Sequence, residues 1–287
     1  MMAGRSVSRR LRMGLQTLLG PVFGLRRQGF FIPYRYADNV AERQPAYVAL
    51  ESRFMAAVPA FAALLSEAGS HEVAFDRIAA TADSPPAPRF TQSWFPTLDA
   101  VAAYTLVRRH RPARIVEVGS GHSTRFLARA VADAGLDTAI TAIDPAPRAS
   151  LQGLPIRFIP AVMQTADPGI FAALRPGDIL FIDSSHILMP GTDVDWLLNR
   201  ILPDLPAGVL VHIHDIFLPD DYPADWGWRG YNEQQGLGPM LAGGWDILFA
   251  SHYMASRHAG IVQESIAGRL PAAAEGRPAS LWLVRPR

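Results

Sequence analysis

A short apolar strand at residues 114–118 runs directly into a glycine turn and then into a helical stretch, and no other segment constrains the fold as strongly. The turn reads Glu117-Val-Gly119-Ser-Gly121, and apolar side chains recur at helical spacing over residues 126–134. Gly119 and Gly121 permit backbone angles, and a close approach of a ligand to the main chain, that a Cβ would forbid. The segment therefore predicts a strand, a turn and a helix that together bind a nucleotide-type cofactor.

The same turn argues against a pyrophosphate ligand. Thr124 stands where the dinucleotide fingerprint has its third glycine, and the chain has no Gly-Lys-Ser/Thr phosphate loop. Glu117 at the strand end suits a cationic or amino-bearing ligand instead, such as the methionine end of S-adenosylmethionine (SAM). His122 or Ser123 is placed to cap the helix that follows. A Gly-x-Gly segment by itself nevertheless fits a structural turn as well as a cofactor site.

Seven apolar runs with strand character alternate with helical stretches in the rest of the chain. They are residues 114–118, 139–143, 156–160, 178–182, 208–213, 246–250 and 280–285. This alternation is typical of repeated βαβ units, which build a mostly parallel sheet with helices on both faces. The sequence therefore predicts an α/β, Rossmann-like fold with a seven-stranded sheet.

The residues before this region have a different pattern. Apolar side chains three to four apart predict a helix over residues 46–68, and Ser-Pro-Pro-Ala-Pro at residues 84–88 predicts a linker. We therefore expect two domains. The first is a basic leader with a helical cap at residues 1–84, and the second is the α/β domain at residues 85–287.

The leader is positively charged. The first 40 residues carry seven arginines against one acid, Asp38, and 13 uncharged residues separate Arg12 from Arg26. That run is too short to span a bilayer, which takes about 20 residues. Such a segment fits either a flexible or cap-forming leader or weak peripheral contact with a membrane surface. We expect a cytoplasmic protein.

The composition excludes several classes of function. The chain has no cysteine, which excludes disulfide scaffolds, thiolate nucleophiles and cysteine-ligated metal sites. All 27 basic residues are arginine, which excludes a lysine Schiff base or a lysine general base. A net charge of +1 gives no reason to expect nucleic acid as a partner. The composition is compatible with a small-molecule substrate and with a homo-oligomer.

Polar residues end several of the predicted strands. They are Glu117, Asp144, Asp183 and the pair His214-Asp215. Ligands in open α/β sheets bind outside the carboxyl ends of the strands, so these side chains are expected to line one site. Asp144 lies 23 residues after Gly121, close to the spacing of about 20 residues at which an acid binds ribose hydroxyls.

With these residues assembled, the chain resembles the class I SAM-dependent methyltransferases, and within them methyltransferase family 24. The matching segments follow one another over residues 85–287, and they are residues 117–124, 143–144, 177–186, 208–217 and 231–234. The first 84 residues match only loosely, at residues 29–36. The resemblance implies a seven-stranded sheet whose last strand, residues 280–285, is reversed.

The resemblance also implies a set of cofactor contacts. The residues concerned are Glu117, Gly119, Gly121, Ser123 and Asp144. It further implies that the adenine lies near residues 161–164, where Gln164 is the candidate contact.

Methyl transfer to oxygen needs an acceptor aligned about 3 Å from the methyl group and a route for its proton. Related sugar O-methyltransferases have a histidine base three residues after an aspartate, and Asp183 and His186 keep that spacing. We therefore predict Asp183, His186 and Asp215 as catalytic residues, with His186 as the general base. Asp183, His214 and Asp215 are candidate ligands of Mg²⁺ or Mn²⁺. His214 departs from the resemblance, because related enzymes tend to have glutamate there, and imidazole is a poorer ligand of magnesium.

Two further expectations concern the region around the fifth strand. His212 is expected to point away from His214 and to be structural. The segment that follows the strand is a natural place for a substrate loop, whose candidates for gripping a polar acceptor are Arg229, Tyr231, Asn232 and Glu233. The leading prediction is an O-methyltransferase acting on a small polar or glycosylated acceptor. The alternatives are a nicotinamide-dependent oxidoreductase and a non-catalytic Rossmann-like scaffold.

Overall fold

The structure is a computed structural model. It describes residues 8, 11–12, 14–19, 23, 29–30, 32–41, 43–81 and 84–286. The chain divides into two compact units, one of residues 1–44 with 223–230 and one of residues 45–222 with 231–287. Five of the seven leader arginines, at positions 5, 9, 10, 26 and 27, lie outside the described residues, so the prediction of membrane contact stays a prediction.

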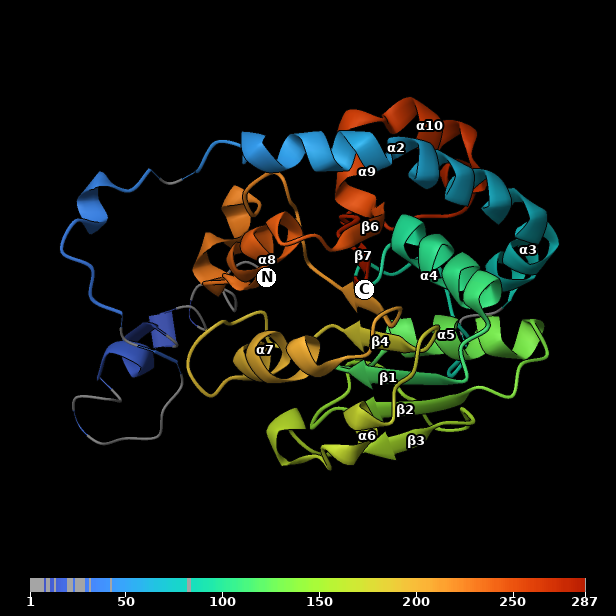
Figure 1. The fold of residues 1–287 in the computed structure, drawn as a ribbon, viewed down its shortest axis with the longest axis horizontal. Helices are drawn as coiled ribbons and strands as arrows, with labels where there is room; N and C mark the ends of the chain where they lie inside the picture. Colours follow the sequence, from blue (N-terminus) through green and yellow to red (C-terminus); the bar gives the residue numbers. More distant parts are fainter. Residues whose placement is uncertain are drawn as a thin grey trace. The chain divides into compact units, whose positions relative to one another are not determined.

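The larger unit is built on one seven-stranded sheet, in the order β3-β2-β1-β4-β5-β7-β6 (Figure 1). The strands are β1 Arg114–Val118, β2 Ala139–Ile143, β3 Arg157–Ile159, β4 Ile179–Ile182, β5 Leu210–Ile213, β6 Asp246–Ala250 and β7 Leu281–Val284. The first five are parallel, and β7 runs antiparallel to both β5 and β6. All seven predicted strands and the reversal of the last one are therefore confirmed.

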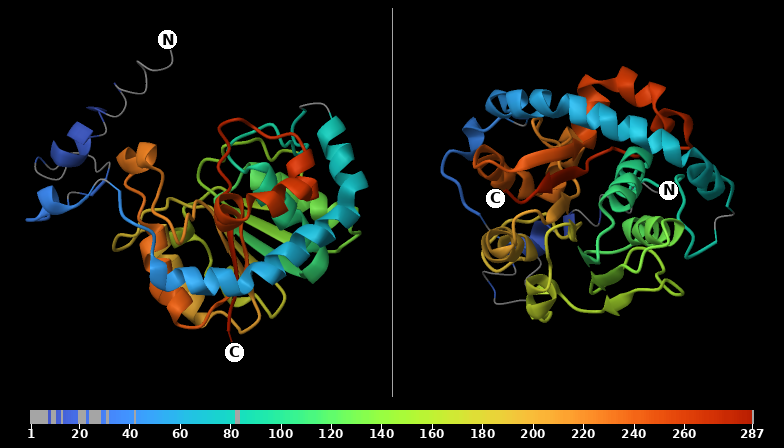
Figure 2. Two further views of the ribbon diagram at one scale, coloured as in Figure 1. Left: turned by 90° about the horizontal axis from the view of Figure 1, so that it is seen from above. Right: turned by 45° about the vertical axis from the view of Figure 1, so that its right-hand side comes forward.

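Helices surround this sheet (Figure 2). They are α2 Val48–Ala68, α3 Glu72–Ala80, α4 Thr97–His110, α5 His122–Asp133, α6 Gly169–Ala172, α7 Asp193–Trp196, α8 Glu233–Ala242, α9 Ser251–Arg257, α10 Ala259–Glu264 and α11 Ile266–Arg269. A π-helical turn, Leu197–Ile201, extends α7. The helix expected over residues 46–68 is confirmed as α2.

The central strands are apolar because both of their faces are covered. Every residue of β4 and of β5 is buried, and at the centre Phe181 stacks on His212 with ring centroids 3.6 Å apart. Continuous apolar runs of this kind are the pattern of a parallel sheet that has helices on both sides. The core therefore fixes the carboxyl ends of β1, β2, β4 and β5 next to one another.

Among the described residues, the helical stretch Val48–Ala80 is long and apolar enough to cross a membrane by length and composition. In the structure, Phe54 and Phe61 of α2 are fully buried, and Phe61 packs edge-on against Phe249 of β6 at 5.7 Å. The Arg53 guanidinium donates to the carbonyl oxygen of Trp245 at 3.0 Å. Packing against the sheet unit thus accounts for the apolar side of this helix.

Candidate functional site

The glycine turn lies against the end of β4. Gly119 has φ of +79°, and a Cβ built on it would lie 1.8 Å from the carbonyl oxygen of Asp183. The backbone N–H of Asp183 donates to the Val118 carbonyl at 2.8 Å, so the two strand ends are tied together. Only glycine satisfies both the positive φ and this close approach. The turn therefore lies directly beside the residues that follow β4.

Glu117 and Ser123 are linked by a hydrogen bond at the glycine turn. The Glu117 carboxylate is fully buried and accepts hydrogen bonds from the hydroxyls of Ser123 and Thr124, both at 2.6 Å. Burial raises the pKa of Glu117 to about 8, although these hydroxyls oppose the shift. Thr124 also accepts from the Gly121 N–H at 2.9 Å. The helix thus begins at His122 with Gly121 as its N-cap, and the predicted side-chain cap from His122 or Ser123 is absent there.

Asp144 closes the turn from the neighbouring strand. Its Oδ2 accepts from the backbone N–H of Ser120 at 2.6 Å and from the Ser120 hydroxyl at 3.1 Å. Its Oδ1 accepts from the Ala146 N–H at 2.7 Å. A carboxylate oxygen has two lone pairs, so Oδ1 retains the capacity to accept from a ribose hydroxyl. The geometry fits the role predicted for Asp144.

Gln164 lies in a 3-10 turn, Met163–Thr165, that follows β3. Its amide nitrogen donates to the Gly191 carbonyl at 3.2 Å. Its Oε1 is buried without a hydrogen-bond partner among the described residues. An unsatisfied buried acceptor is costly, and the exocyclic amino group of an adenine would satisfy it. The chemistry of Gln164 therefore fits the adenine contact that the resemblance implied.

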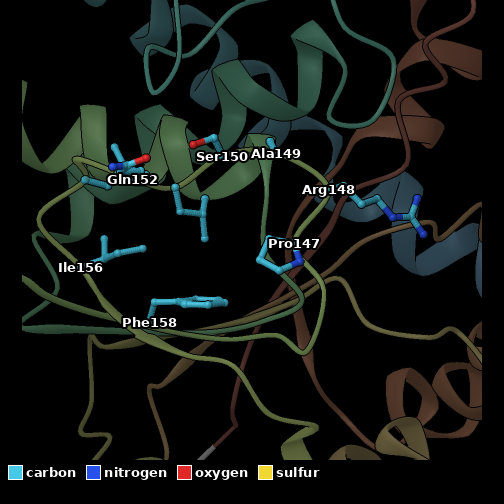
Figure 3. Close-up of a pocket in the computed structure, with 9 residues that line it drawn as sticks. Pro147, Arg148, Ala149, Ser150, Gln152, Ile156 and Phe158 are labelled. Atoms are coloured by element: carbon cyan, nitrogen blue, oxygen red, sulfur yellow. The ribbon is translucent and has the colours of Figure 1, made fainter.

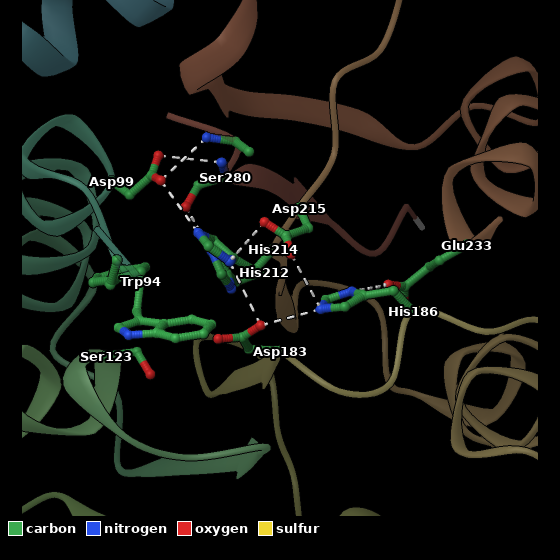
Figure 4. A network of polar contacts seen from close by, with 12 residues as sticks. Trp94, Asp99, Ser123, Asp183, His186, His212, His214, Asp215, Glu233 and Ser280 are labelled. Atoms are coloured by element: carbon green, nitrogen blue, oxygen red, sulfur yellow. Dashed lines mark hydrogen bonds and ion pairs between the residues drawn. The ribbon is translucent and has the colours of Figure 1, made fainter. Parts of the chain in front are cut away.

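The predicted catalytic residues converge beyond the ends of β4 and β5 (Figure 4). His186 Nε2 lies 3.4 Å from Asp183 Oδ1 and 3.4 Å from Asp215 Oδ2. His214 Nδ1 lies 3.5 Å from Asp183 Oδ1 and 3.5 Å from Asp215 Oδ1. Two imidazoles and two carboxylates thus alternate around one point, and we call these four residues the inner cluster.

A second carboxylate stands behind each imidazole of the inner cluster. Glu233 Oε2 lies 2.9 Å from His186 Nδ1, and Asp99 Oδ2 lies 3.2 Å from His214 Nε2. Both acids are fully buried. Asp99 also accepts from the backbone N–H groups of Ala279 and Ser280, each at 3.1 Å. Asp99 was not predicted from the sequence, although a lone acid among the apolar residues of α4 is a signal that it needs a buried partner.

The backbone at this site is strained. His186 has φ of 61° and Asp215 has φ of 56°, in the left-handed region that non-glycine residues rarely adopt. Each such residue costs about 1–3 kcal/mol, and such strain clusters at functional sites because it aims a side chain. One side chain follows β4 and the other follows β5, so the strain directs both into the inner cluster.

The carboxylates keep the imidazoles charged. Burial alone lowers the pKa of His186, but the hydrogen bonds with Asp183 and Glu233 and the charge of Asp215 raise it well above 6.5. Burial is likewise outweighed at His214, whose pKa the charges of Asp183 and Asp215 raise well above its ordinary value. In return, the two imidazoles hold the pKa of Asp183 well below 3.8 despite its burial. The inner cluster is therefore an array of ion pairs near neutral pH.

This array does not fit the divalent metal predicted on Asp183, His214 and Asp215. In the part of the chain that the structure describes, no group of three or more histidine, aspartate, glutamate or cysteine side chains could hold a metal ion. The imidazole nitrogens lie 3.4–3.5 Å from the carboxylate oxygens, so these side chains pair with one another. The prediction of Mg²⁺ or Mn²⁺ finds no support, and we assign no step to a metal.

The predicted substrate residues differ in where they lie. Asn232 is bonded to the backbone of Leu188, accepting from its N–H at 2.6 Å and donating to its carbonyl at 3.2 Å. Glu233 is fully buried behind His186. Both residues therefore hold the loop that carries His186. This positioning role was not predicted from the sequence.

The two other candidates contact aromatic rings. The Tyr231 ring lies 4.6 Å from the His186 ring, so it borders the inner cluster beside Glu233. Arg229 belongs to the smaller unit, where its guanidinium lies 3.9 Å from the Trp226 ring. Acceptor binding by these side chains stays a prediction.

The expected orientation of His212 was wrong. The rings of His212 and His214 stack with centroids 5.9 Å apart, because residues two apart on a strand face the same side. His212 Nε2 lies 2.8 Å from the Ser280 hydroxyl, and burial holds the pKa of His212 well below 6.5. His212 is thus a neutral imidazole beneath the inner cluster.

Residues 116–216 match the family model of a methyltransferase domain, methyltransferase family 24. This segment contains the glycine turn, Asp144 and the whole inner cluster, so the match confirms the resemblance found in the sequence. Among the curated proteins, none matches the chain significantly.

The chain is also similar to three solved structures, two of methyltransferases and one of a cofactor-bound protein. The O-methyltransferase TomG from Streptomyces achromogenes, in complex with SAM, is 19% identical, with 77% of this chain and 89% of that chain covered and a TM-score of 0.39. Cofactor-bound Rv0187 from MTB is 18% identical, with 85% and 100% covered and a TM-score of 0.42. SAH-bound PaMTH1 from Podospora anserina is 17% identical, with 76% and 93% covered and a TM-score of 0.38.

Proposed function

We propose that this chain, whose residues 116–216 form a methyltransferase domain of family 24, transfers the methyl group of SAM to a hydroxyl oxygen of a small polar or glycosylated acceptor. The observation that carries the proposal is the contact between the glycine turn and the inner cluster, because Gly119 lies against the Asp183 carbonyl. Cofactor site and proton-accepting groups are thereby adjacent.

On the cofactor side, four residues supply what SAM requires. Gly119 and Gly121 leave room against the main chain, Asp144 offers an acceptor for ribose, and Gln164 offers an unsatisfied acceptor for adenine. When bound, SAM supplies an electrophilic methyl group on a sulfonium ion.

On the acceptor side, His186 receives the proton. Its Nδ1 is held by Glu233, so Nε2 is the nitrogen directed into the inner cluster. As the acceptor oxygen forms its bond to the methyl carbon and the carbon–sulfur bond breaks, the hydroxyl proton passes to Nε2. The imidazolium that results is stabilised by Asp183 and Asp215, each 3.4 Å from that nitrogen.

The raised pKa of His186 gives this mechanism a pH dependence. A base must be neutral before it can accept a proton, and His186 is charged below its raised pKa. The groups facing it are Glu233, Asp183 and Asp215, with the Tyr231 ring beside it. Turnover is therefore expected to increase as the pH rises above 6.5 toward that pKa.

The proposal is tested by incubating the purified protein with SAM and a panel of hydroxylated acceptors, including glycosides and phenols, and measuring S-adenosylhomocysteine (SAH). We expect acceptor-dependent SAH formation that His186→Ala reduces by at least about a hundredfold, the usual contribution of a general base. SAM binding should be retained in that variant. Matched amine acceptors provide the control for oxygen specificity.

Two alternative functions would give different results. A nicotinamide-dependent oxidoreductase would bind NAD in preference to SAM. A non-catalytic scaffold would bind SAM without turnover on any acceptor, and His186→Ala would change nothing. Either outcome would replace the proposal.

A further inference from the structure

We propose that Trp94 is a cofactor-discriminating residue, whose indole, braced by Arg148, closes over the cofactor site and favours the cationic sulfonium of SAM over the neutral thioether of SAH. The proposal rests on the proposed function, since it requires SAM at the glycine turn. It adds a residue outside the matched segment 116–216 and a reason for the by-product to leave.

Trp94 is exposed although its surroundings are buried. Its side chain is 51% exposed, whereas Gln92 is 5% and Phe95 is 1% exposed. Gln92 Oε1 accepts from the backbone N–H groups of Trp94 and Phe95, both at 2.8 Å, and so fixes this turn before α4. The turn therefore holds the backbone of Trp94 in place while its indole stays accessible to a ligand.

Arg148 holds the indole from the opposite side of the site. Its guanidinium carbon lies 4.2 Å from the centroid of the Trp94 ring. A Cβ built on Gly121 would lie 3.9 Å from the Cβ of Arg148, so this arginine stands next to the glycine turn. The pair thus joins the segment before α4 to the segment after β2, across the place predicted for the cofactor.

Arg148 also lines one end of a neighbouring cavity. The cavity has a volume of about 560 Å³ and lies along residues 147–158, between the end of β2 and β3. Figure 3 shows the Arg148 side chain directed away from Ile156 and Phe158, which line the other end of that cavity. At that end, its guanidinium lies over the Trp94 ring.

The indole is directed toward the catalytic residues. Figure 4 shows the Trp94 ring pointing toward Asp183 of the inner cluster. The face of a tryptophan ring attracts a cation within about 6 Å, by about 0.5–1 kcal/mol when exposed and about 2 kcal/mol when desolvated. A neutral thioether gains no such attraction. Trp94 is thereby placed to distinguish the charged cofactor from its uncharged product.

The test is calorimetric titration of wild type, Trp94→Leu and Trp94→Phe with SAM and with SAH. We expect Trp94→Leu to weaken SAM binding about 3–30-fold, the range of a cation–π contact, and SAH binding less than about twofold. Trp94→Phe should retain most of the preference for SAM, because its ring keeps a π-face. Equal losses for SAM and SAH in Trp94→Leu would show that Trp94 is only a wall of the site and would overturn the proposal.

Trp196→Leu is the matched control, because Trp196 also stacks with an arginine, Arg200, at 4.4 Å, but on a segment without predicted cofactor residues. It should leave both affinities unchanged, and a changed SAM-to-SAH ratio there would contradict the assignment to Trp94. The two proposals fail separately. Absence of SAM binding to wild type refutes the proposed function, whereas tight binding with an unaltered ratio in Trp94→Leu refutes only the role of Trp94.

Discussion

Glu233→Gln keeps the size of a fully buried side chain but removes the carboxyl group 2.9 Å from His186 Nδ1. Burial raises the pKa of this carboxyl group, and the hydrogen bond with His186 lowers it. A hydrogen bond to a charged group contributes about 1.5–3 kcal/mol, and one between neutral groups about 0.5–1.5 kcal/mol. The substitution therefore removes about 1–1.5 kcal/mol of stabilisation from the charged imidazole. The midpoint of the His186 titration should move to lower pH by about one pH unit.

Nuclear magnetic resonance of histidine-labelled protein measures this midpoint without knowledge of the acceptor. The chain has eight histidines, and the His186 signal is identified by its loss in His186→Gln. Asp220→Asn is the matched control, because Asp220 pairs with His252 at 2.8 Å outside the inner cluster. It should leave the His186 midpoint in place. An unchanged midpoint in Glu233→Gln, or a higher one, would refute the claim that Glu233 helps to hold the proton on His186.

Three further substitutions follow from the geometry. Gly119→Ala places a Cβ 1.8 Å from a backbone oxygen at φ of +79°. It should therefore lower the free energy of unfolding by at least about 1–3 kcal/mol and abolish SAH binding. Normal stability and normal SAH affinity, both measured by calorimetry, would contradict the close approach. Asp144→Ala should weaken SAH binding about tenfold or more, and unchanged affinity would mean that Asp144 does not contact the ribose. Phe181→Ala empties a fully buried position and should lower the free energy of unfolding in urea by about 3–5 kcal/mol, whereas Phe158→Ala, at a ring that is 38% exposed, should cost much less; equal losses would refute the assignment of Phe181 to the core.

The strands could be predicted from the sequence because each one is a short, continuous apolar run. Buried parallel strands show this pattern without reference to their partners, so residues 178–182 and 208–213 predicted β4, Ile179–Ile182, and β5, Leu210–Ile213. The glycine turn was equally visible, because the positive φ of Gly119 is a local requirement. Strand ends then placed Asp183, His186 and Asp215 at one edge.

The second carboxylate behind each histidine could not be predicted in the same way. Asp99 lies 115 residues from His214 in the sequence, and Glu233 lies 47 residues from His186, so neither pairing has a local signal. Glu233 and Asn232 were expected to bind the acceptor because they lie in the segment after β5, a natural place for a substrate loop, and that role stays a prediction. The burial of Glu233 depends on how α8 packs, which periodicity does not describe.

The charge state of the inner cluster also could not be predicted from the sequence. Carboxylates and histidines at adjacent strand ends are compatible with a metal site or with ion pairs, and the choice depends on which atoms face one another. His186 Nε2 and His214 Nδ1 each lie 3.4–3.5 Å from one carboxylate oxygen of Asp183 and one of Asp215. These contacts raise the pKa of both histidines. These distances are set by the pairing of β4 with β5, so they can be known only from the folded structure.

Calorimetric titration of the wild-type protein with SAH, with NAD as the control ligand and with or without Mg²⁺, tests the central claim most directly. We expect SAH to bind near the micromolar range, about −8 kcal/mol, with no binding of NAD and no dependence on Mg²⁺. Absence of SAH binding to a folded protein, or a preference for NAD, would contradict the assignment of the glycine turn, Asp144 and Gln164 to a SAM site.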